Sequence, residues 1–173
     1  MRLALLLPLL IIAVPAQAQT APPPQPAPCA SDPLFRLQDF TLGSWEVSRN
    51  GVKSADVQMD RALDGCAILE HWTALPGKRG NGIGLFTYSR VLNAWTYAWA
   101  SETGAATMFT GQSVSATEIR YDTERPLPAG GKRLRRWTLS LLPDGRIREL
   151  SVGSEDGGTV WATEYELIWT KKP

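Results

Sequence analysis

The sequence predicts an all-β protein, a single antiparallel β-barrel of about 8–10 strands with a short N-terminal helix. Short runs rich in Trp, Tyr, Val, Ile and Thr recur after residue 40, separated by turns of Gly, Asn, Asp or Pro. No stretch in that region keeps a helical period. Several runs place bulky aromatic residues on one face and small or mixed residues on the other. This pattern favours a barrel with a partly polar lumen, and a β-sandwich is the alternative.

Ten runs have strand character. In AWTYAWAS, alternation puts Trp95, Tyr97 and Trp99 on one face. In the last run, alternation puts Trp161 and Thr163 on the same face as Tyr165. The expected strands are residues 44–49, 55–63, 66–74, 82–90, 94–101, 106–112, 117–122, 132–142, 146–154 and 159–170.

The chain is expected to begin with a cleaved leader. Arg2 precedes an apolar run from Leu3 to Val14, and Ala16-Gln17-Ala18 supplies a small-residue cleavage site. We therefore expect a signal peptide over residues 1–18, a Pro-rich disordered linker over 19–30 and one barrel domain over 31–173. The product would be periplasmic or secreted, without membrane insertion after cleavage.

The expected helix lies in SDPLFRLQDF, residues 31–40. Leu34, Leu37 and Phe40 recur at three-residue spacing, which would place them on one face. Asp32 stands where an N-cap is needed, and Pro33 suits the first turn.

Charge gives no reason to expect a nucleic-acid or anionic-lipid partner. The chain has 18 Lys and Arg against 17 Asp and Glu, and removing Arg2 with the leader balances the two signs. No nucleic-acid partner is expected, and the chain is expected to be a monomer or a weak homodimer.

Two cysteines, Cys29 and Cys66, follow the leader, and in an exported protein they predict a disulfide. Two free buried thiols are the alternative. One histidine, His71, and two distant cysteines fit no zinc spacing, so neither a metal nor a cofactor is expected.

An ordered series of motifs resembles bacterial secreted lipocalin-like proteins catalogued as a domain of unknown function. The similarity covers about residues 29–171 and implies an exported, lipocalin-like antiparallel barrel without an assigned activity. The chain departs from the family pattern after Tyr121, where a long Pro- and Gly-containing stretch replaces a tight connection. The motifs are the G-x-W element in Phe40–Val47, Leu63–Cys66 running into Glu70–Trp72, Gly84–Tyr88, Trp95–Trp99, Arg146–Glu149 and Ser154–Trp161.

The stretch CAILEHWTA looks reactive but is interpreted as a wall strand. Alternation puts Glu70 and Trp72 on one face and His71 on the other, so Glu70 and His71 cannot act on one ligand. A buried Glu70 would need a partner such as Arg136, Arg148 or the polar group of a ligand. The expected lumen-lining residues are Trp45, Glu70, Trp72, Tyr88, Trp95, Trp99, Arg136 and Glu149.

Ser154–Trp161 is nearly an Asp-box, a turn in which Asp156 binds backbone amides and Trp161 packs beneath. It occurs once, which argues against a glycosidase. Lys132, Arg133, Arg135 and Arg136 form a basic run that is expected at a solvated surface or rim.

Three functions remain open. The preferred one is an exported, non-enzymatic barrel that binds a small apolar or amphipathic ligand. The second is an enzyme that uses Glu70 and Glu149 as lumen acid and base. The third is a structural envelope protein without a ligand. A packed interior without a cavity of about 300 Å³ would argue against the binding protein. Solvent-facing Glu70 and Glu149 side chains would argue against the enzyme.

Overall fold

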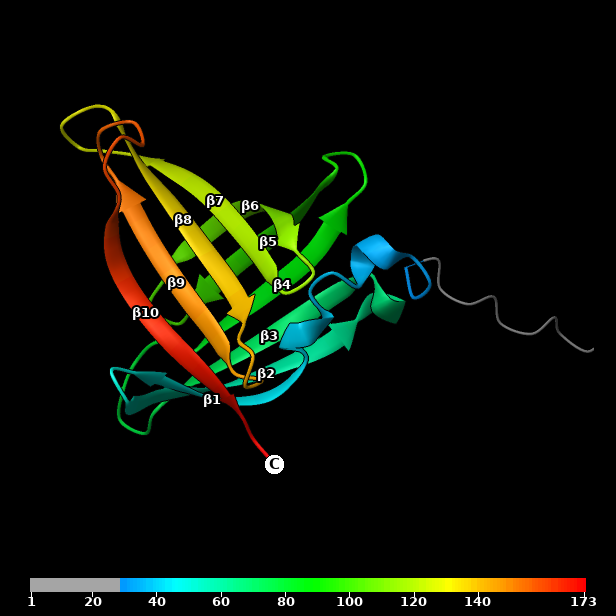
Figure 1. Cartoon of the computed structure of the whole chain (residues 1–173). Helices are drawn as coiled ribbons and strands as arrows, with labels where there is room; N and C mark the ends of the chain where they lie inside the picture. Colours follow the sequence, from blue (N-terminus) through cyan, green and yellow to red (C-terminus); the bar gives the residue numbers. More distant parts are fainter. Residues whose placement is uncertain (1–28) are drawn as a thin grey trace, which may run out of the picture.

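The computed structural model describes residues 29–173, so the expected leader and most of the linker lie outside the described region. Cys29 and Ala30, the last two residues of the expected linker, belong to the described structure. Ten strands form a closed antiparallel barrel in which each strand pairs with its neighbours in sequence and β1 pairs with β10 (Figure 1). The strands are β1 (Gly43–Arg49), β2 (Val52–Ala62), β3 (Ala67–Ala74), β4 (Gly82–Ser89), β5 (Ala94–Ser101), β6 (Ala106–Ser115), β7 (Glu118–Pro126), β8 (Lys132–Leu141), β9 (Ile147–Ser154) and β10 (Ala162–Lys171).

All ten expected strands are present, and the predicted all-β barrel is confirmed. The largest difference concerns the stretch after Tyr121, which was expected to be a long connection. Instead, β7 and β8 stay paired as far as Pro126↔Lys132, and only residues 127–131 form the turn. The register between β7 and β8 is continuous there, and the β-branched Thr123 favours the strand before the turn residues begin, whereas β7 loses its backbone pairing with β6 beyond Asp122.

In place of one N-terminal helix over residues 31–40, the structure has two short 3-10 turns, η1 (Pro33–Phe35) and η2 (Asp39–Thr41). A third turn, η3 (Leu63–Gly65), connects β2 to β3. Asp32 caps η1 as expected, since its side chain accepts a hydrogen bond from the Leu34 amide at 3.0 Å. The predicted apolar face is wrong at Leu34, which is exposed, because the 3-10 turn directs Phe35 into the core instead.

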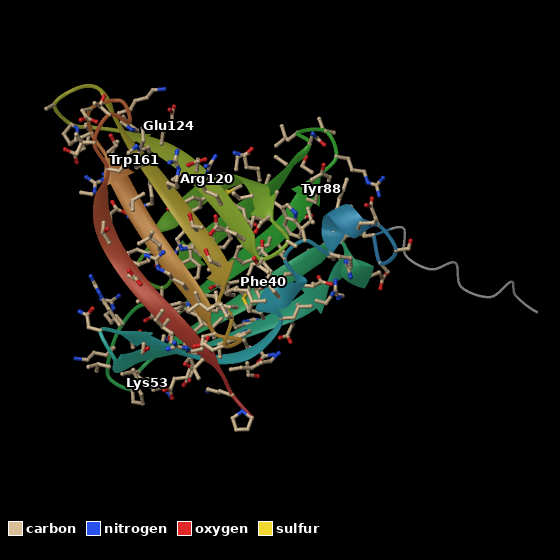
Figure 2. The ribbon with its side chains drawn as sticks, in the orientation of Figure 1. Phe40, Lys53, Tyr88, Arg120, Glu124 and Trp161 are labelled. Atoms are coloured by element: carbon tan, nitrogen blue, oxygen red, sulfur yellow. A yellow bond between two sulfur atoms is a disulfide. The ribbon has the colours of Figure 1, made fainter. Side chains whose placement is uncertain are left out.

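The N-terminal segment closes one end of the barrel. It lies against the ends of β2 and β4 and the start of β3, and Phe40 is within it (Figures 1 and 2). Gln38 is fully buried there and accepts a hydrogen bond from the Tyr121 hydroxyl. The Trp45 indole donates to the Thr41 carbonyl at 2.7 Å, so this end is sealed by packed side chains.

A disulfide joins Cys29 to Cys66 and holds the N-terminal segment against the start of β3. The Arg36 side chain also donates to the Gly65 carbonyl, and Arg61 pairs with Asp39 at 2.7 Å. Among residues 29–173, no helix is long and apolar enough to cross a membrane.

The core consists largely of aromatic rings that cross the barrel interior. Phe86 and Tyr97 are stacked with centroids 4.0 Å apart, and Tyr97 and Trp137 are stacked at 4.9 Å. Glycines make room for two of these rings, because a Cβ at Gly84 would overlap Tyr97 and one at Gly111 would overlap Tyr121. The layer fills the middle of the lumen and sets the floor of the space above it.

The turn between β9 and β10 has the predicted Asp-box chemistry. Asp156 Oδ1 accepts hydrogen bonds from the amides of Thr159 and Val160, both at 3.0 Å. The Trp161 indole donates to the Gly158 carbonyl at 2.9 Å. Trp161 lies at the end of the barrel opposite Phe40 (Figure 2).

Removal of the disulfide by the double substitution Cys29→Ala and Cys66→Ala is expected to lower the free energy of unfolding by about 4 kcal/mol. The reason is that the bond spans 37 residues and restricts the unfolded chain. Urea titrations followed by far-ultraviolet circular dichroism measure the change. Wild-type protein treated with a reductant should match the variant, and an unchanged midpoint in both would contradict the role assigned to the bond.

Candidate functional site

The barrel contains a cavity of about 380 Å³ above the aromatic layer, toward the end opposite the N-terminal segment. Strand alternation directs its wall residues inward from β1, β2, β3, β5, β6, β8, β9 and β10. The aromatic lining consists of Tyr97 and Trp137 from the aromatic layer together with Trp72, Trp99, Phe109 and Tyr165. The charged lining residues are Arg49, Glu70, Arg135 and Glu149.

Glu149 on β9 is held by two indoles. Trp137 Nε1 donates to one carboxylate oxygen at 2.7 Å, and Trp169 Nε1 donates to the other at 2.9 Å. The side chain is buried, which raises the pKa of Glu149, while the donated hydrogen bonds lower it by a smaller amount. These donors orient the carboxyl group without supplying a positive charge.

Glu70 on β3 is also buried, with 2 % of its surface exposed. Burial raises its pKa to about 8, a hydrogen bond from Tyr97 opposes the rise, and the charge of Glu149 adds to it. The Tyr97 hydroxyl donates to Oε2 at 2.8 Å. Among residues 29–173, neither Glu70 nor Glu149 forms an ion pair, so the cavity floor holds two interacting acids without a cation.

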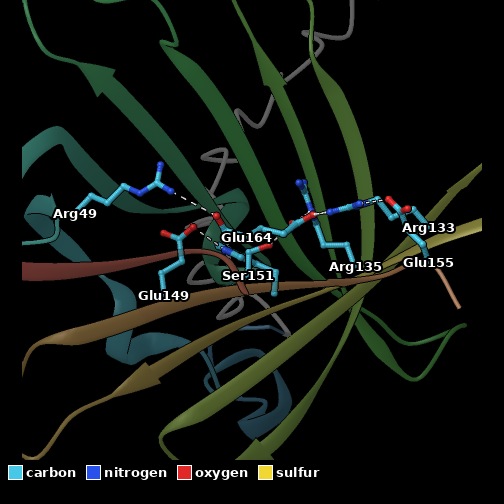
Figure 3. Close-up of polar contacts among 8 residues, drawn as sticks. Arg49, Arg133, Arg135, Glu149, Ser151, Glu155 and Glu164 are labelled. Carbon is cyan, nitrogen blue, oxygen red and sulfur yellow. Dashed lines mark hydrogen bonds and ion pairs between the residues drawn. The ribbon is translucent and has the colours of Figure 1, made fainter. Parts of the chain in front are cut away.

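The rim carries the positive charges, gathered around Glu164 (Figure 3). Arg133 Nε and Arg135 Nε donate to Glu164 at 3.0 and 2.6 Å, and the Ser151 hydroxyl donates at 2.8 Å. Burial alone would raise the pKa of Glu164, but these donors outweigh it and hold the pKa below its ordinary value. Arg49 Nη2 donates to the Glu164 carbonyl oxygen at 3.4 Å. The rim location expected for Arg133 and Arg135 is therefore observed.

A β-bulge accounts for the position of Glu164. The pairing of β10 with β9 shifts between Thr163 and Tyr165, which exchanges the faces on either side. The expectation that Trp161 and Thr163 share the face of Tyr165 is therefore wrong. Tyr165 lines the lumen, whereas Thr163 is exposed and Trp161 packs outside against Arg136.

Four of the eight expected lining residues border the cavity: Glu70, Trp72, Trp99 and Glu149. Trp45, Tyr88 and Trp95 are buried but do not border it. Trp45 hydrogen-bonds to Thr41, and Tyr88 packs edge to face against Phe35 at 5.6 Å.

Arg136 lies on the outer face, where it pairs with Asp122 at 3.1 Å and stacks on Trp161 at 4.4 Å. It therefore does not partner Glu70. Its neighbour Arg135 takes the inward position, because alternate residues of β8 face opposite sides. Arg148 is also on the outer face and pairs with Glu166 at 2.9 Å.

Six further residues at the cavity and its rim were not predicted from the sequence: Tyr97, Phe109, Arg135, Trp137, Glu164 and Tyr165. The alternation of AWTYAWAS already grouped Tyr97 with Trp99, so Tyr97 could have been included. Glu164 could not have been predicted as a site residue, because its position depends on the β-bulge between Thr163 and Tyr165. His71 is exposed on the face opposite Glu70, and within the described region no group of three His, Cys, Asp or Glu side chains could hold a metal ion.

The barrel wall is incomplete near the cavity. Backbone pairing between β6 and β7 ends at Thr110↔Asp122, although both strands continue toward the open end. Beyond that point Thr123 Oγ1 donates to the Met108 carbonyl at 2.7 Å. Thr107 and Arg135 line both the lumen cavity and a surface groove at this place.

Comparison with known proteins assigns no family. No family model matches the chain, and no curated protein is significantly similar to it. The geometry of the cavity is therefore the principal guide to function.

The substitution Glu70→Gln is expected to flatten the dependence of stability on pH. The folded pKa of Glu70 is raised from 4.5 to about 8, so the folded state binds this proton more tightly than the unfolded chain. Stability from this group is present below the ordinary pKa and is lost as pH rises through about 8, at up to about 1.4 kcal/mol per pH unit. Glu149 contributes in the same direction, so the variant keeps part of the slope.

Urea titrations of both proteins between about pH 5 and pH 8 measure this slope. Glu166→Gln is the matched control, because Glu166 is exposed on the outer face and its pKa is lowered by Arg148. Equal slopes for wild type and Glu70→Gln would show that Glu70 titrates normally.

Proposed function

We propose that this chain is an exported barrel that binds a small molecule, apolar or amphipathic, without transforming it. The observation that carries the proposal is the cavity of about 380 Å³ with aromatic walls and a few inward polar groups. Ligand sites in proteins usually have this composition and volumes of about 300–1,000 Å³. The aromatic layer beneath the cavity gives it a rigid floor.

Export is supported by two independent features. The first is the leader-like sequence from Met1 to Ala18. The second is the disulfide between Cys29 and Cys66, because such bonds persist in oxidising compartments. We therefore propose a periplasmic or secreted location, in agreement with the resemblance to secreted lipocalin-like proteins.

An enzyme is the second candidate, and one observation favours it. Glu70 and Glu149 both line the cavity, and the pKa of each is raised, as in carboxyl pairs that act as general acid and base. The test is to identify by native mass spectrometry the molecule that co-purifies with the chain, and then to incubate that molecule with protein. A product that forms with wild type and not with Glu70→Gln would favour the enzyme over the binding protein.

Binding in the lumen is testable with N-phenylnaphthylamine, a neutral apolar dye whose fluorescence rises in dry sites. We expect one dye per chain, and about tenfold weaker binding after Thr107→Trp. Thr107 lines the cavity beside Trp99, so the larger side chain fills the space. Isothermal titration calorimetry and dye fluorescence measure the affinity.

Thr110→Trp is the matched control, because Thr110 is on the same strand, β6, but its side chain is exposed. It should leave dye binding unchanged. Absence of dye binding, together with absence of any co-purified molecule, would favour the structural envelope protein without a ligand. Binding that Thr107→Trp does not weaken would place the dye outside the lumen.

A further inference from the structure

The unusual feature of the cavity is the separation of its charges. The floor holds Glu70 from β3 and Glu149 from β9, and burial followed by the charge of Glu149 raises the pKa of Glu70. The positive groups that line the cavity, Arg49 from β1 and Arg135 from β8, are engaged with Glu164 at the rim. Among the described residues, the other titratable side chains that interact with these two carboxyl groups are the tyrosines Tyr97, Tyr121 and Tyr165.

We propose that the cavity selects a small organic cation, whose protonated amine lies between the carboxylates of Glu70 and Glu149. The inference rests on the proposed function and names its ligand class. Two buried carboxylates without a counterion are costly, and a cation from the ligand would remove that cost. A neutral ligand would not reduce the cost of burying the two carboxylates.

The hydrogen bonds on the floor leave room for such a group. Tyr97 occupies Oε2 of Glu70, while Oε1 accepts no hydrogen bond from any residue in the described range. Both oxygens of Glu149 accept from indole N–H groups, and the Tyr165 hydroxyl also interacts with this carboxylate. These neutral donors hold the carboxylate in position and leave its charge uncompensated. An ammonium group has only donors, so it complements acceptors of this kind.

The walls also suit a cation. Trp72 and Trp99 meet edge to face with centroids 6.5 Å apart, and Tyr97 and Trp137 are stacked beside Glu70 and Glu149. The faces of such rings carry partial negative charge and attract ammonium groups, most strongly when water is excluded. A cavity of about 380 Å³ holds an amine that carries one or two rings or a short chain.

The occupied and empty states would differ by a proton. In the empty cavity, burial keeps a proton on Glu70 near neutral pH. A bound ammonium takes the place of that proton, which leaves to solvent. Association of a cation near neutral pH should therefore release up to about one proton per ligand, whereas a neutral ligand should release none.

The experiment compares three matched probes with wild-type protein at neutral pH: naphthylethylamine, naphthylethanol and naphthylacetate. They share one aromatic body and differ in charge. We expect the amine to bind about tenfold more tightly than the alcohol, and the acetate to bind least. Calorimetry in buffers with different ionisation enthalpies measures the affinity and the proton release together.

Glu70→Gln should reduce the preference for the amine over the alcohol to about twofold and lower proton release, while alcohol binding is kept. The amide still accepts the Tyr97 hydroxyl, so the variant is expected to fold. Glu166→Gln, on the outer face of β10, should keep both the preference and the proton release. Glu149→Gln provides a second test at the other carboxylate.

Equal affinities for the three probes, or tighter binding of the acetate, would overturn the cation inference and leave small-molecule binding intact. Failure of all three probes and of N-phenylnaphthylamine would overturn the proposed function as well. A preference for the amine that persists in Glu70→Gln and Glu149→Gln would place the cation elsewhere, and it would also overturn the inference.

Discussion

Closure of the sheet between β1 and β10 is the constraint on which the rest of the structure depends. The pairs from Trp45↔Lys171 to Ser48↔Ile168 satisfy both strands that would otherwise be edges. Once the sheet is closed, every strand has one face in the lumen and one in solvent. Barrels of about eight strands are just wide enough for side chains to fill, so ten strands enclose more space than aliphatic residues can occupy. Stacked aromatic rings span the middle of this lumen, and the N-terminal segment seals one end.

Closure of the sheet also places the side chains of Glu70 and Glu149 inside the lumen. Glu70 and Glu149 take inward, buried positions on their strands, and this burial makes each carboxyl group costly to ionise. Indole and phenol donors hold them in place, and the arginines stay at the rim with Glu164. An arrangement that costs stability and is held by specific donors is more typical of a functional site than of a structural core.

Much of the fold could be read from local patterns. Period-two alternation in AWTYAWAS predicts an inward stripe of Trp95, Tyr97 and Trp99, and the structure has it, because a strand offers no other way to separate large from small residues. The Asp-box turn at Asp156 also follows local chemistry. The prediction fails where one residue changes the register, at the bulge beside Glu164, since alternation cannot reveal an inserted position.

The sequence by itself determined the all-β class, the ten strands and the opposite faces of Glu70 and His71, because each depends on local periodicity. The residue types predicted the disulfide, and the structure confirms it. Only the tertiary structure decided which inward residues border the cavity and which are packed. Trp45, Tyr88 and Trp95 face inward like Trp99, but they lie at the sealed end. The meeting of Glu70 with Glu149 depends on the closure of strands that are far apart in the chain, and no local pattern records that distance.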